Sequence, residues 1–159
     1  MKIRHPSDAP GPSQADHGGV LATGSDLLDA QRAFVRASRS RRRAAIARRL
    51  RREPAVCGRL HVYDQPLAGG AAGVRSVPLD AIGGTLEPSR AAMFDVAFRP
   101  DRRARERWQR VWLLEHRGTP LPPVDLVRVG DGYAVADGHH RVSVARARGA
   151  VDIDATIAG

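Results

Sequence analysis

The chain has 159 residues, which suits one domain of ordinary size with a tail. Hydrophobic residues make up 42% of the chain and aromatic residues 4%, so we expect a core built mainly from Val, Leu, Ile and Ala. No apolar run approaches the roughly 20 residues that cross a bilayer, which excludes a membrane-spanning helix from the expected elements. The first residues lack the apolar segment of a secretory signal. Together with the single cysteine, Cys57, this predicts a cytoplasmic protein that makes no membrane contact.

The formal net charge of +9 favours contact with polyanions, including nucleic acid. Lys2 is the only lysine, so nearly all of the positive charge comes from arginine. Arginine in place of lysine, together with many Ala and Gly residues, is also what a GC-rich coding sequence produces. The charge therefore has two explanations at this point, a polyanionic partner or codon bias.

Residues 1–24 are rich in Pro, Gly, Ser, Asp and His and have almost no apolar pattern, which predicts a disordered tail. A basic helix is predicted over residues 25–54, with Ser25 as its N-cap and Pro54 at its end. The second half of this helix is dense in arginine and would contact nucleic acid through phosphates. The candidate contacts are Arg41, Arg42, Arg43, Arg48 and Arg49. The alternative is a solvated helix face that binds nothing.

Residues 55–73 are predicted to be a linker that ends in a glycine-rich stretch. A short strand is expected over residues 74–79, where apolar residues precede a proline. Residues 80–99 are loop-like because glycine and proline interrupt them, and one helical turn is expected near residues 91–94.

A second helix begins at Pro100 and Asp101 and ends at Gly118, where a left-handed residue is expected. Trp108 and Trp112 lie one turn apart on its apolar face. This spacing favours packing in the core or against a partner over a platform for base stacking.

The last third of the chain alternates strands with a helix. Strands are predicted over residues 124–129 and 133–137, joined by a glycine-containing hairpin turn. A helix follows over residues 139–148, and the alternation of apolar and polar residues over 151–157 predicts a terminal strand with one wet face.

The turn before this last helix, Asp137-Gly138-His139-His140-Arg141, is the most informative motif. Gly138 permits a tight turn, after which the amide groups and dipole of the helix N-terminus would attract an anion such as phosphate. Arg141 adds a planar positive fork, and either histidine can donate to phosphate or act as a general acid or base. Asp137 would orient a histidine or a substrate hydroxyl, or hold a cation. The alternative is a plain helix cap with surface histidines. Because neighbouring residues diverge on a helix, we predict no metal site.

Two segments resemble the ParB and sulfiredoxin superfamily. Val77-Pro-Leu-Asp-Ala-Ile82, with Arg90 eight residues later, resembles its first box, and residues 137–145 resemble its second. The resemblance covers about residues 74–157. It implies an α+β fold, a small ParB/sulfiredoxin-like mixed sheet with packed helices, in a domain over residues 74–159 that follows the basic N-terminal helix.

The resemblance also implies a nucleotide site, because the second box holds the phosphates of CTP in ParB proteins and lies at the ATP site in sulfiredoxins. By position, Gly138 would let the backbone approach a phosphate, and His139, His140 and Arg141 would contact it. Arg90 would face the same pocket. His139 stands where sulfiredoxins have their cysteine, so sulfinic acid reduction is not expected. The third nucleotide box and the helix-turn-helix region of ParB proteins have no counterpart here, so operator binding is not expected either.

The predicted function is a ParB-like module that binds CTP or ATP, with Mg²⁺, through the Gly-His-His-Arg turn. Slow phosphoryl transfer or hydrolysis would use His139, His140 or Asp137 as acid or base. Two alternatives stay open. One is a non-enzymatic DNA- or RNA-associated protein that acts through the arginine-rich helix, and the other is a ParB-like nuclease.

Overall fold

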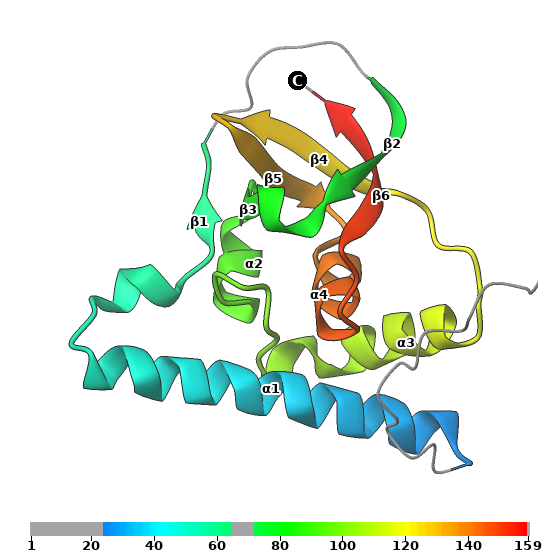
Figure 1. Ribbon diagram of the computed structural model, residues 1–159, viewed down its shortest axis with the longest axis horizontal. Coiled ribbons are helices and arrows are strands. Elements are labelled where there is room, and N and C mark those ends of the chain that lie inside the picture. Colours follow the sequence, from blue (N-terminus) through cyan, green and yellow to red (C-terminus); the bar gives the residue numbers. More distant parts are fainter. Residues whose placement is uncertain (1–23, 65–71, 159) are drawn as a thin grey trace, which may run out of the picture.

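The computed structural model describes residues 24–64 and 72–158 (Figure 1). The tail predicted over residues 1–24 lies outside the described residues except for Gly24. Within the described part, the α-helices are α1 (Asp26–Leu50), α2 (Pro88–Met93), α3 (Arg105–His116) and α4 (His139–Ala147). The strands are β1 (His61–Val62), β2 (Ala72–Pro78), β3 (Ile82–Thr85), β4 (Val124–Val129), β5 (Gly132–Asp137) and β6 (Asp152–Ala158).

The strands form one mixed sheet in the order β1-β3-β5-β4-β6-β2. β4 and β5 form an antiparallel hairpin and β2 pairs antiparallel with β6, whereas β1 with β3, β3 with β5, and β4 with β6 are parallel. The strands predicted over residues 74–79, 124–129, 133–137 and 151–157 are confirmed as β2, β4, β5 and β6. Helices packed on a mixed sheet confirm the predicted α+β class.

The linker and loop predictions were wrong in part. Residues 55–64 include β1, which adds a strand to the sheet instead of joining two units. Residues 80–99 contain β3 and α2, and α2 begins at Pro88, before the single turn expected near residues 91–94. The sheet and its helices therefore use more of the chain than the pattern of glycines and prolines indicated.

Gly83 and Gly84 explain why β3 was missed, because both were taken as breakers. In the structure they lie inside the strand. A side chain at Gly84 would collide with the ring of Tyr63 and the carbonyl of His61, which pass close by at β1. Glycine within a strand commonly marks such a close approach of another backbone.

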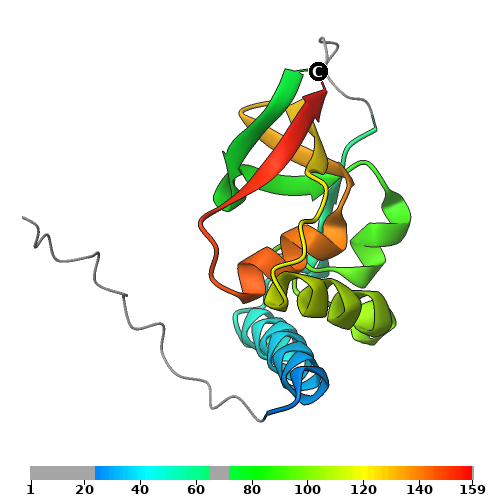
Figure 2. The same ribbon diagram turned by 90° about the vertical axis from the view of Figure 1, so that its right-hand side faces the viewer.

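Helices α4, α3 and α1 follow one another away from the sheet. Figures 1 and 2 show the sheet at one end of the molecule, α4 and α3 next to it, and α1 at the opposite end. The fully buried Trp108 of α3 joins these layers. Its indole Nε1 donates to Ser143 Oγ of α4 at 2.9 Å, and its ring meets Phe34 of α1 edge-on at 5.6 Å between centroids. Trp108 and Trp112 are both buried, as predicted for core residues.

Helix α1 belongs to the core and is not a separate extension. Ala30, Ala33 and Phe34 are buried on the side that faces α3, in the same apolar cluster as the sheet residues. The helix ends at Leu50, four residues before the predicted end at Pro54. Among the described residues, no helix is both long enough and apolar enough to span a membrane.

Candidate functional site

The site begins at the turn between β5 and α4. Gly138 has φ +99°, in the left-handed region that favours glycine. A Cβ at this position would lie 2.6 Å from Cγ1 of Val124 in β4, so the turn also packs too tightly for a side chain. No side chain caps α4. The first amide groups of the helix therefore keep hydrogen-bonding capacity for a ligand.

A cavity of about 260 Å³ lies over this turn. The predicted site residues come together there, since Asp137, Gly138, His139, His140, Arg141 and Arg90 all line it. The remaining wall residues are Arg107, Val111, Leu121 and Pro122. Arg90 comes from α2, Arg107 from α3 and Arg141 from α4, so three separate helices bring a positive charge to one cavity.

The two histidines are buried, with 3% and 5% of their surface exposed. Nε2 of His139 is hydrogen-bonded to Oγ1 of Thr85 at the end of β3, at 2.6 Å. Nε2 of His140 is buried and has no hydrogen-bond partner among the described residues. A buried polar atom without a partner is costly, which suggests that a ligand or solvent satisfies it.

Both imidazoles are neutral near pH 7. Burial, then the charge of Arg90, lowers the pKa of His139 from 6.5 to about 4, against an opposing effect of Asp137. Burial, then Arg107 and Arg90, lowers the pKa of His140 to about 4 as well. A plain helix cap would place these histidines on the surface, whereas the structure buries both of them.

Arg141 is only partly available to an anion. Its Nη2 forms an ion pair with Oδ2 of Asp137 at 2.8 Å, and its Nη1 donates to the carbonyls of Pro122 and, at 2.9 Å, Pro123. The arginine thus ties the proline-rich segment before β4 to the start of α4. Asp137 pairs with this guanidinium and makes no hydrogen bond to either histidine, contrary to one of its predicted roles.

The other two arginines differ in their freedom. Nε of Arg90 is paired with Glu87 at 2.9 Å, and Nη1 approaches the sulfur of Met93 at 3.5 Å. Arg107 is exposed and has no hydrogen bond or ion pair within residues 24–64 and 72–158. Arg107 is therefore the cation most ready to receive a ligand.

Sequence reasoning missed Arg107 and Thr85. Helical spacing places Arg107 on the polar face of its helix, opposite Trp108 and Trp112, but it does not show which neighbour that face meets. Thr85 lies in the strand that was taken for a loop. The available signal for Arg107 was an arginine with no acidic residue three or four positions away on its helix, and no sequence signal singled out Thr85.

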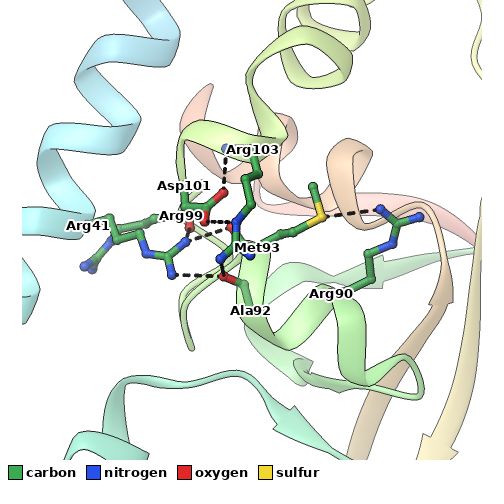
Figure 3. Close-up of polar contacts among 7 residues, drawn as sticks. All are labelled: Arg41, Arg90, Ala92, Met93, Arg99, Asp101 and Arg103. Atoms are coloured by element: carbon green, nitrogen blue, oxygen red, sulfur yellow. Dashed lines mark hydrogen bonds and ion pairs between the residues drawn. The ribbon is translucent and has the colours of Figure 1, made fainter.

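The arginines predicted to contact nucleic acid fall into two groups. Arg41 donates to the carbonyls of Met93 at 2.7 Å, and of Ala92 and Arg99 at 3.4 Å each (Figure 3), so it serves the fold. Arg48 is half-buried, and its guanidinium lies against Gly58. The remaining three are exposed, and no polar partner is found for them in the described part of the chain: Arg42, Arg43 and Arg49.

No group of three or more His, Cys, Asp or Glu side chains suited to a metal ion occurs among the described residues. No family model, curated protein or solved structure matches the chain. The ParB and sulfiredoxin resemblance thus stays a prediction made from the residues.

Proposed function

We propose that this protein binds a nucleotide and holds its phosphates in the cavity at the start of α4. The observation that carries the proposal is the convergence of Arg90, Arg107 and Arg141 on the uncapped N-terminus of α4. Cations and free helix amides in one cavity are the usual elements of a phosphate site. Asp137, the one carboxylate among the described residues that line the cavity, is paired with Arg141.

The cavity suits the phosphates better than a whole nucleotide. Its volume of about 260 Å³ is below the range of roughly 300–1,000 Å³ that is typical of pockets for drug-sized ligands. The base and ribose would therefore lie outside it. Val111, Leu121 and Pro122 are the apolar residues of the lining, and they are the nearest candidates to contact the base.

The histidines favour binding over rapid turnover. With a pKa of about 4, neither His139 nor His140 holds the proton that a general acid needs near pH 7. A neutral imidazole can still donate one hydrogen bond to a phosphate oxygen.

Asp137 would coordinate the Mg²⁺ that arrives with the nucleotide, since Mg²⁺ in such sites uses one or two carboxylates and the phosphates. Any phosphoryl transfer here is expected to be slow. The single cysteine, exposed in the structure, fits the cytoplasm as the place of this function.

Titration calorimetry with CTP, ATP, GTP and inorganic tripolyphosphate, with and without Mg²⁺, tests the proposal. The wild type should bind at least one nucleotide, and Arg107→Gln should weaken it about tenfold, the loss expected for one charge-assisted hydrogen bond. Arg110→Gln is the matched control, because Arg110 lies on the same helix but outside the cavity. Its effect should be less than about twofold.

Two results would contradict the proposal. Absence of binding by every nucleotide and by tripolyphosphate under all of these conditions would remove the proposed function. Equal losses in Arg107→Gln and Arg110→Gln would show that the affinity reflects the general positive charge and not this cavity.

A further inference from the structure

A second basic site lies between α1 and the start of α3, away from the histidines. It is a groove of about 590 Å³. Arg39 and Arg42 line it from α1, and Arg102 and Arg105 line it from the other side. All four side chains are exposed, and none has a hydrogen bond or ion pair within the described part of the chain.

The acidic residue in the groove does not neutralise these cations. Asp101 accepts a hydrogen bond from the backbone amide of Arg103 at 2.8 Å and forms an ion pair with its Nε at 2.9 Å. Its carboxylate therefore serves a neighbouring arginine and caps the turn that leads into α3. Of the five arginines that line the groove, Arg39, Arg42, Arg102 and Arg105 therefore have no acidic partner among the described residues.

The two walls are fixed relative to one another before any ligand arrives. Arg41 of α1 donates to the carbonyl of Met93 at 2.7 Å, and the backbone amide of Asp101 in the other wall donates to the same carbonyl at 2.8 Å. Arg41 and Arg103 also both approach the carbonyl of Ala92, each at 3.4 Å. Figure 3 shows the two guanidinium groups meeting at this carbonyl, with the ion pair between Arg103 and Asp101 beside it. Preorganised walls reduce the cost of ordering the site when it binds.

Apolar residues line the same groove: Phe34, Val35, Ala45 and Pro100, of which Val35 is the most exposed. A single nucleic-acid strand matches this arrangement, since its phosphates would meet the arginines and its bases would lie against the apolar residues. A duplex keeps its bases stacked inside and would use the arginines alone. We infer that the groove between α1 and α3 binds single-stranded nucleic acid without sequence preference. This site is separate from the cavity of the proposed function, and neither depends on the other.

Fluorescence anisotropy with a labelled oligothymidylate of about 20 nucleotides, longer than a typical single-strand site, tests the inference. The test variant is Arg39→Gln with Arg105→Gln, one arginine from each wall. It should weaken binding at least tenfold and lower the slope of log affinity against log salt by about 1.4, at about 0.7 for each single-strand phosphate contact. Oligouridylate should behave in the same way.

The matched control is Arg75→Gln with Arg128→Gln, which removes equal charge from β2 and β4 at the sheet end of the molecule (Figure 1). It should keep affinity within about twofold. If the first variant is poorly folded by circular dichroism, Arg42→Gln with Arg102→Gln replaces it. Lack of binding by the wild type at low salt, equal losses in test and control variants, or duplex binding as tight as single-strand binding would each overturn the inference.

Discussion

Gly138 is the residue on which the geometry of the candidate site depends. Its positive φ and its contact with Val124 each argue against any other residue at this position. The glycine turns the chain from β5 into α4 so that both histidines become buried beside the helix N-terminus. A change here should therefore affect both stability and ligand binding.

Gly138→Ala should lower the free energy of unfolding by about 2–5 kcal/mol, the sum of left-handed strain and overpacking. Gly149→Ala is the control, because Gly149 also has a positive φ, +77°, but nothing lies within 4 Å of its missing Cβ. It should cost only about 1–2 kcal/mol, the strain alone. Urea denaturation measures both. In a double-mutant cycle with Val124→Ala, Gly138→Ala should cost less free energy of unfolding, by the part that comes from the collision with Val124. Equal costs for the two glycine variants would contradict this account of the turn.

The buried histidines make stability depend on pH. Their pKa is about 4 in the folded protein and 6.5 without the fold, so between these values the unfolded chain holds more protons. The free energy of unfolding should therefore be highest above pH 6.5 and fall as the pH drops toward 4. Between pH 7 and pH 5 the loss should be about 2 kcal/mol for each imidazole.

Chemical denaturation at a series of pH values measures this loss. The double variant His139→Gln with His140→Gln should show a much smaller slope in the same window. His61→Gln, which removes an exposed histidine, should keep the slope of the wild type. A wild-type stability that does not change between pH 7 and pH 5 would show that the imidazoles are not buried in the neutral form.

At the scale of elements, α1 shows how an arginine-rich helix can serve the fold. Its alanines and Phe34 face α3, and Arg41 reaches the carbonyls at the end of α2 (Figure 3). Arg41→Gln should destabilise the protein by about 1–2 kcal/mol, because it removes hydrogen bonds from a charged donor. Arg42→Gln, one residue along and exposed, should change stability by no more than about 0.5 kcal/mol. Thermal or urea unfolding distinguishes the two, and equal effects would contradict the role given to Arg41.

The same elements show what the sequence could and could not predict. Strands β2, β4, β5 and β6 and helices α1, α3 and α4 were predicted because apolar periodicity and turn residues mark them. β1 and β3 were missed because β1 is two residues long and β3 carries two glycines, of which Gly84 is required by the close approach of β1. Local patterns do not report that another backbone passes close to a residue.

The candidate site was predicted unevenly for a similar reason. Gly138 and the residues after it predict the turn at residues 137–141, and Arg90 was added from the family resemblance. Arg107 is brought to the cavity by the packing of α3 against α4, which is a tertiary contact. The burial of the histidines also follows from packing, with the ring of Phe94 next to both.

At the scale of the whole molecule, positive charge is concentrated at the helical end. The α4 cavity and the groove between α1 and α3 lie there, and α3 contributes Arg107 to the first and Arg105 to the second. Arginines that stabilise the fold alternate with arginines that have no partner in the described residues. The arginines without a partner include Arg39, Arg42, Arg102 and Arg105 of the groove and Arg107 of the cavity, so these are the places to test for polyanion binding.

The central claim is that phosphates bind at the start of α4, and amide NMR during a titration tests it most directly. Adding the nucleotide that binds tightest should shift the backbone amide signals of His139, His140 and Arg141 in a saturable way, because these amides are the free donors of the helix. Tripolyphosphate should shift the same signals. Saturable nucleotide binding that leaves these three amides unchanged would contradict the account.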